Sequence, residues 1–246
     1  MKIIGKRKIG CVRSTRFQTG ATLIELMIGL ALSLIVTSSM VVLMGSTMGS
    51  ATRIIEMSQL TDELRNTMSM LTRDVRRANY NPYSLYCYSN SDCGVDDTTT
   101  RTNFIGDLNL VAGGTCLVYS LERVIEDDGL PGDIGGGGFR LATTGGVGRI
   151  EMWTGDLAPP ADCSGNSWVA VTDPEFVNIT NFIADDAEGP DGTFEGTINR
   201  QDGTLMLTQR VRQIRVTLEG QLLLDGTITR RVEDVIKVRN DFIESA

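Results

Sequence analysis

The stretch that decides the fold is Phe17-Gln-Thr-Gly20-Ala21-Thr-Leu-Ile-Glu25-Leu-Met, which continues as an almost unbroken apolar run to about Met48. No charged residue occurs between Glu25 and Arg53. A helix rises about 1.5 Å per residue, so this run is long enough to cross a hydrocarbon core of about 30 Å. The sequence therefore predicts one membrane helix near the N-terminus, with a single carboxylate close to its start.

The residues before this run are basic. Residues 1–20 carry six Lys and Arg residues and no acidic residue, whereas the other 226 residues carry 17 basic and 31 acidic groups, a net charge of −14. The basic flank predicts that the N-terminus stays in the cytoplasm while the chain beyond the helix crosses the membrane. An ordinary secretory leader places its apolar core before the cleavage site, but here the apolar run follows the small residue Gly20.

The order and spacing of Gly20, Ala21 and Glu25 resemble the type IV prepilin family. The resemblance implies that residues 1–20 are a leader removed by prepilin peptidase, and that the mature chain begins with an N-methylated Ala21. It also implies that Glu25 pairs with the α-amino group of a neighbouring subunit and sets the axial register of a filament. The first mature residue of this family is most often Phe, so Ala21 is a departure from the pattern, and it bears on methylation more than on cleavage. A carboxylate that snorkels to the membrane interface is the alternative role for Glu25.

Beyond the membrane segment the pattern becomes that of an amphipathic helix. One apolar stripe recurs at spacings of three and four residues, and it consists of Met57, Leu60, Leu64, Met68, Leu71, Val75 and Ala78. The run Asn79-Tyr-Asn-Pro82 is a stop signal. We therefore expect one helix over residues 21–79, with residues 21–48 in the membrane and residues 53–79 packed against a head. Gly45 and Gly49 form a GxxxG pattern, which indicates either a helix-dimer face or a locally weak helix, and the family resemblance favours the second.

Residues 80–246 have the texture of a β-rich head. Strands are predicted at 115–121, 139–142, 147–153, 168–172 and 176–183, followed by an alternating pattern at 213–218 and a last strand from Ile228 towards Val238. Asp225-Gly226 predicts a type I′ hairpin turn. The fold class is thus α+β, pilin-like, with a long N-terminal helix on an antiparallel sheet. The stretches Arg76-Arg-Ala-Asn-Tyr80 and Val238-Arg-Asn240 resemble minor pilins of the PilW type.

The cysteines predict two disulfides. Cys11 lies in the leader, which leaves Cys87, Cys93, Cys116 and Cys163 in a segment predicted to be outside the cytoplasm. Four cysteines allow three connectivities, of which Cys87–Cys93 with Cys116–Cys163 is favoured because the first pair flanks a short polar loop. The spacing contains no CxxC, so a metal site fits poorly.

The composition argues against most enzymes. There is no histidine, which removes the usual general base and the commonest metal ligand, although carboxylate chemistry stays open. An acidic mature chain also disfavours nucleic acid as a partner. Two acidic, glycine-rich stretches, 126–138 and 185–192, are expected to be polar loops rather than calcium sites, because neither has EF-hand spacing. We expect no cofactor and no metal.

Taken together, the resemblance implies a minor pilin that primes assembly and lies near the tip of a type IV pilus. The expected partners are prepilin peptidase, other minor and major pilins, the inner-membrane assembly platform and a tip adhesin. Before assembly the chain would be a single-pass inner-membrane protein with its head in the periplasm, and after assembly it would be extracellular. The alternatives are a J-type pseudopilin of a type II secretion system and, from another class, an uncut membrane-anchored binding protein or enzyme.

Overall fold

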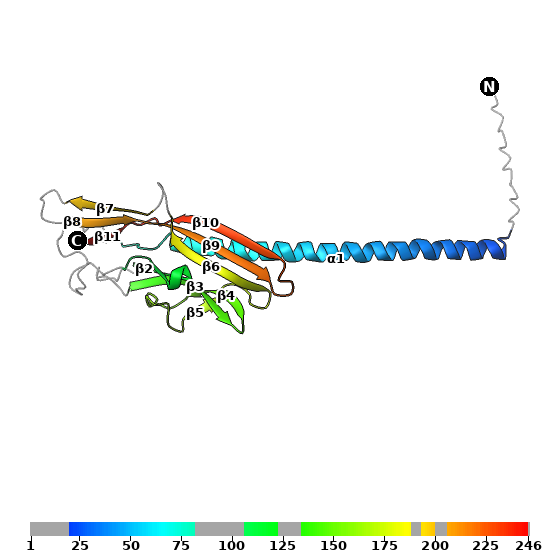
Figure 1. Ribbon diagram of the computed structural model, residues 1–246, viewed down its shortest axis with the longest axis horizontal. Helices are drawn as coiled ribbons and strands as arrows, with labels where there is room; N and C mark the ends of the chain where they lie inside the picture. The colour runs from blue at the N-terminus through cyan, green and yellow to red at the C-terminus, as the bar shows by residue number, and fades with distance from the viewer. Residues whose placement is uncertain (1–19, 82–105, 123–133, 188–192, 200–205, 246) are drawn as a thin grey trace, which may run out of the picture. The chain divides into compact units, whose positions relative to one another are not determined.

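The structure is a computed structural model that describes residues 20–81, 106–122, 134–187, 193–199 and 206–245 (Figure 1). The chain forms two compact units, Met1–Arg53 and Ile54–Ala246. The helix α1 (Leu23–Val75) is continuous over 53 residues and contributes to both units. It begins two residues later and ends four residues earlier than the predicted helix over 21–79.

The first unit consists, in its described part, of the apolar half of α1. Its large apolar side chains between Leu23 and Met48 are 55 to 76 % exposed on every side of the helix, which is long and apolar enough to cross a membrane. The helix also carries hydroxyl groups that donate to carbonyls one turn back, so their polar hydrogens are satisfied without water. These residues are Ser33, Thr37, Ser38, Ser39, Ser46, Thr47, Ser50 and Thr52.

The remainder of α1 belongs to the second unit and buries one stripe. Leu60, Leu64 and Val75 are fully buried, and Met68 and Leu71 nearly so, whereas Arg65, Arg73 and the other charged residues lie off the stripe. This is the amphipathic face predicted from the spacing of the apolar residues. Fully burying one such side chain stabilises the fold by about 1.5–3 kcal/mol, so this stripe anchors the helix to the head.

A five-stranded antiparallel sheet, in the order β1-β2-β3-β4-β5, forms one part of the head. Its strands are β1 (Asn109–Val111), β2 (Cys116–Glu122), β3 (Ile134–Thr144), β4 (Val147–Trp153) and β5 (Trp168–Ala170), with a short 3-10 turn η1 (Ala112–Gly114) between β1 and β2. The predicted strand at 147–153 is confirmed residue for residue. β3 is longer than predicted, for a reason given below.

The head also contains two three-stranded sheets with corresponding strand orders. One sheet has the order β10-β9-β6 and the other β11-β8-β7, and every pairing is antiparallel. Each strand of one sheet is consecutive in the chain with the strand at the same place in the other sheet: β6 with β7, β9 with β8 and β10 with β11. Only Arg212 separates β8 from β9. The strands are β6 (Val177–Asp186), β7 (Phe194–Asn199), β8 (Met206–Val211), β9 (Gln213–Leu222), β10 (Thr229–Lys237) and β11 (Phe242–Ser245).

The core of the head lies where α1 meets the five-stranded sheet and the β10-β9-β6 sheet. One cluster joins the buried stripe of α1 to Leu117, Phe139 and Ile150 of the first sheet and to Phe182 and Leu218 of the second. A smaller cluster forms around Cys116, Cys163 and Trp168. The α+β, pilin-like architecture predicted from the sequence is therefore present.

The structure corrects one part of the predicted polar loop 126–138: the glycine run at its end belongs to a strand. Residues 135–138 are buried in β3 and pair with β2, opposite Leu121 to Val118. A Cβ on Gly137 would overlap the Tyr119 ring, and one on Gly138 would come within 3.1 Å of Trp168. These glycines are therefore strand residues that let aromatic side chains lie directly on the backbone. The acidic part of that stretch lies outside the described residues.

The turn chemistry also differs from prediction. Asp225-Gly226 does not form a type I′ turn, because Gly226 has no positive φ and residues 223–228 make a longer connection. The Asp225 carboxylate instead accepts a hydrogen bond from the Thr227 amide at 3.0 Å, and the Asp225 carbonyl accepts one from Ile228. The type I′ geometry occurs at Gly145-Gly146, where φ is 61° and 85° between β3 and β4. Asp185 and Asp186, predicted to begin a loop, are the last residues of β6.

Candidate processing and assembly site

The bond between Gly20 and Ala21 lies in exposed, non-helical backbone. Both residues precede the first residue of α1, Leu23, and a Cβ placed on Gly20 would meet nothing within 4 Å. Because α1 begins at Leu23, this bond lies outside the helix. A protease binds its substrate in an extended conformation, which non-helical backbone can adopt. The predicted cleavage site is therefore in an accessible place.

Glu25 occupies the third position of α1. The Thr22 hydroxyl accepts a hydrogen bond from the Glu25 amide at 3.4 Å, and the Thr22 carbonyl accepts the first helical bond from Leu26. Thr22-Leu-Ile-Glu25 thus has the Thr-x-x-Glu spacing of a capping box, in which an acidic third residue also favours the positive end of the helix dipole. The sequence analysis missed this local role, which the Thr-x-x-Glu pattern itself would have revealed.

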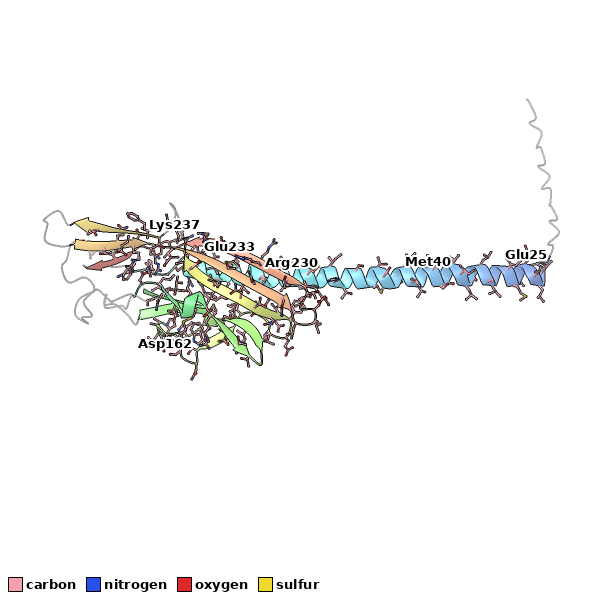
Figure 2. All side chains as sticks on the ribbon, in the orientation of Figure 1. Glu25, Met40, Asp162, Arg230, Glu233 and Lys237 are labelled. Atoms are coloured by element: carbon pink, nitrogen blue, oxygen red, sulfur yellow. A yellow bond between two sulfur atoms is a disulfide. The ribbon has the colours of Figure 1, made fainter. Side chains whose placement is uncertain are left out.

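The Glu25 side chain faces a shallow groove on one side of the helix. Ala21, Leu26, Gly29, Leu30 and Ser33 line this groove together with Glu25. Figure 2 shows Glu25 at the N-terminal end of α1, well before Met40. In the part of the chain that the structure describes, no cation contacts the carboxylate, which leaves it available to a group from outside.

The C-terminal segment caps the C-terminal end of α1. Asn79 adopts a left-handed conformation, with φ 62°, and ends the turn that follows Val75. The Asn240 side-chain amide donates to the carbonyls of Arg77 at 3.4 Å and Ala78 at 3.0 Å. The Arg239 amide donates to the Arg76 carbonyl at 3.1 Å. The two stretches that resemble PilW-type pilins, one at residues 76–80 and one at residues 238–240, therefore contact each other.

A network of ion pairs lies where β8 passes into β9. Asp107 accepts hydrogen bonds from Asn79 at 3.0 Å and from Arg210 at 2.7 Å, and it pairs with Arg212 at 3.2 Å. Arg212 also donates to both carboxylate oxygens of Asp186, at 2.8 and 2.9 Å. The hydrogen bonds that Arg210 donates to Asp107 and Glu195 raise the pKa of Arg210. This network, which the sequence analysis did not predict, connects the end of α1 to the junction of the two smaller sheets.

The predicted disulfide between Cys116 and Cys163 is present, with a Cα–Cα distance of 6.6 Å. Cys87 and Cys93 lie outside the described residues, so their pairing stays a prediction. Next to the disulfide, Arg140 lies 4.6 Å from the centre of the Trp168 ring and donates to the Cys163 carbonyl at 2.9 Å. These contacts fix the loop that carries Cys163 to β3 and β5.

Glu151 is the most buried charged side chain of this region. It is 4 % exposed and pairs with Arg140 at 2.8 Å and Arg149 at 2.7 Å. Burial alone would raise the pKa of Glu151, but the hydrogen bonds and charges of Arg140 and Arg149 outweigh it and lower the pKa. The arrangement suits a structural ion pair, since both carboxylate oxygens are occupied.

The described residues contain no group of three or more His, Cys, Asp or Glu side chains arranged to hold a metal ion. Asp186, from one of the two acidic stretches, is engaged by Arg212. Asp185 is exposed in β6, and the other acidic residues of those stretches, from Glu126 to Asp133 and from Glu188 to Asp191, lie outside the described residues.

The chain matches one family model over residues 53–238, and its description is prepilin peptidase-dependent protein B. No curated protein and no solved structure gives a significant match. The matched range covers the amphipathic half of α1 and almost all of the head, and it does not include Gly20, Ala21 or Glu25. The chain therefore belongs to the prepilin peptidase-dependent protein B family.

Proposed function

We propose that this chain is a minor pilin, a structural subunit that primes assembly of a type IV pilus and lies near its tip. One observation carries the proposal: two separate parts of the chain indicate the same class. The Gly20–Glu25 motif resembles that of a prepilin, and the family match rests on residues 53–238, which do not include that motif. A chance resemblance at the N-terminus would not be accompanied by a family match in the head.

The geometry supports a defined sequence of events. The membrane helix holds the precursor in the inner membrane with its basic leader in the cytoplasm. Cleavage after Gly20 frees the Ala21 amine, and the exposed apolar surface of α1 then packs against the helices of other subunits. Glu25 would meet the new amine of a neighbour within that apolar packing, where an unpaired charge is costly. The proposal includes no catalytic activity, because the chain has no histidine and its buried carboxylate Glu151 is held by two arginines.

One feature favours the pilus over the pseudopilus. Residues 76–80 and 238–240 resemble PilW-type pilins, and they form one contact at the end of α1. The length of residues 21–246 bears on a different choice: it exceeds that of a typical major pilin, which suits a minor subunit present in few copies. A J-type pseudopilin has the same plan and is the second candidate.

Deletion of the gene separates the two candidates. We expect the deletion strain to lose sheared surface pili and twitching motility, while secretion of type II substrates is unchanged, and a wild-type copy should restore piliation. Loss of secretion with normal piliation would instead assign the chain to a type II secretion system. No change in either readout would contradict both.

A further inference from the structure

A basic groove lies between the exposed face of α1 and β10. It has a volume of about 530 Å³ and is lined by Arg65, Met68, Ser69, Thr72, Arg73, Arg76 and Arg77 of α1 and the turn after it, by Val232, Glu233 and Asp234 of β10, and by Arg239. Five of these eleven residues are arginines, in a chain whose residues 21–246 have a net charge of −14. We call it the arginine groove.

The two carboxylates in the groove are already engaged. Asp234 accepts a hydrogen bond from the Thr72 hydroxyl at 3.2 Å and another from the Val235 amide at 2.9 Å. Glu233 pairs with Arg231 at 3.0 Å and with Arg215 at 3.5 Å, both outside the groove. Within the described residues, neither carboxylate forms an ion pair with an arginine of the groove.

Four of the five arginines carry free charge. Arg77 pairs with Asp74 at 2.7 Å, but within the described residues no carboxylate contacts Arg65, Arg73, Arg76 or Arg239. All four are exposed. Arg65, Arg73 and Arg76 repeat at spacings of eight and three residues, which places them on one face of α1 and of the turn that continues it. The backbone of Arg239 lies beside Arg76, because the Arg239 amide donates to the Arg76 carbonyl.

We propose that the arginine groove binds an acidic segment of a neighbouring subunit. The identity of this partner rests on the proposed function, but the binding chemistry does not. Guanidinium groups bind carboxylates with two parallel hydrogen bonds, and four of them along one groove suit an extended segment with several Asp or Glu residues. Nucleic acid carries a denser negative charge than a peptide segment with several carboxylates, so the net charge of −14 over residues 21–246 and the groove carboxylates Glu233 and Asp234 repel nucleic acid more strongly.

The test measures binding by the full-length chain in detergent. The probes are a fluorescein-labelled peptide of alternating Glu and Thr, the same peptide with Gln in place of Glu, and a labelled oligothymidylate of matching length. We expect the acidic peptide to bind, the Gln peptide not to bind, and binding to weaken with added salt. The double variant Arg73→Glu/Arg76→Glu should lose about tenfold or more in affinity.

A matched variant distinguishes binding of the peptide at the groove from a general effect of net charge. Arg230→Glu/Lys237→Glu makes the same change in net charge on β10, where Figure 2 labels both residues. Neither residue lines the arginine groove. We expect this control to bind the acidic peptide nearly as well as the wild type. Equal losses in both double variants, or tighter binding of oligothymidylate than of the acidic peptide, would overturn the proposal.

Occupation by an acidic segment of the same chain gives a different result. In that case the wild-type chain would not bind the peptide, and Arg73→Glu/Arg76→Glu would lower its Tm; this outcome also contradicts the proposal.

In cells, the Arg73→Glu/Arg76→Glu variant should be processed at Gly20 but assemble poorly. Normal assembly of a variant that no longer binds the peptide would show that the groove is not an assembly contact. Failure of processing in the wild type would instead count against the proposed function, so the two failures are distinguishable.

Discussion

Glu25 has two roles that one substitution separates. As the third residue of a capping box it supports the start of α1, and a glutamine serves equally well in that position. As the partner of a neighbouring amine it must carry a negative charge. Glu25→Gln should therefore keep the helix and be cleaved normally after Gly20, yet assemble poorly. Thr22→Ala, which removes the cap and keeps the charge, is the control and should cost only about 1 kcal/mol of helix stability. Normal piliation by the Glu25→Gln variant would exclude the proposed role of the charge.

Glu151 gives the head a defined response to acid. Its pKa is lowered in the folded state by Arg140 and Arg149, so its stabilising contribution is present above about pH 4.3, the usual value for a glutamate, and disappears as the pH falls through the lowered pKa. Glu151→Gln should lower the free energy of unfolding at pH 7 by about 1–3 kcal/mol and flatten its decline towards acid. Denaturation curves between pH 7 and pH 3 measure both effects. An unchanged acid slope in the variant would show that other carboxylates dominate.

At the residue scale, the sequence allows a site to be predicted at the N-terminus but not the contacts in the head. Gly20, Ala21 and Glu25 lie within six residues of one another, so their spacing was visible. Asp107 and Arg212 are 105 residues apart, and only the fold brings them together. Thr22 was missed for a different reason, because its Thr-x-x-Glu pattern was present and was not considered.

At the scale of elements, the end of α1 depends on a residue far away in the sequence. The Asn240 amide satisfies the carbonyls of Arg77 and Ala78, which have no partner within the helix. Asn240→Ala should lower the free energy of unfolding of the head by about 1 kcal/mol. Asn66→Ala, an exposed position within α1, is the matched control and should have little effect. A larger loss in the control than in Asn240→Ala would contradict the assigned cap.

Element prediction succeeded where periodicity was strong and failed at glycines. The stripe of α1 and the alternation in β9 follow directly from apolar spacing, and both were predicted. The prediction gave β3 too few residues, because a run of four glycines is typical of a loop. In the structure these glycines form a strand, and Tyr119 and Trp168 lie against it. The Asp-Gly turn failed because the residues around it close a longer loop through the Asp225 side chain.

For the whole molecule, the disulfide between Cys116 and Cys163 constrains the head. The bond between Cys116 and Cys163 closes a loop of 47 residues, and such a bond contributes about 2–4 kcal/mol to stability. We expect thiol labelling of the denatured, unreduced mature protein to detect no free cysteine, since Cys87 and Cys93 are predicted to pair. Cys116→Ser/Cys163→Ser should unfold at lower denaturant concentration and still carry no free thiol. Labelling of two thiols in the wild type would disprove the second bond.

The central claim concerns the whole chain: it is a processed prepilin and not an uncut membrane anchor. The family match supports this claim through the head, and the membrane helix and the exposed Gly20–Ala21 bond support it through the N-terminus. The most direct measurement is the intact mass and N-terminal sequence of the protein taken from membranes with and without prepilin peptidase. The account predicts a chain that begins at Ala21 only when the peptidase is present. A chain that keeps residues 1–20 in both strains would contradict it.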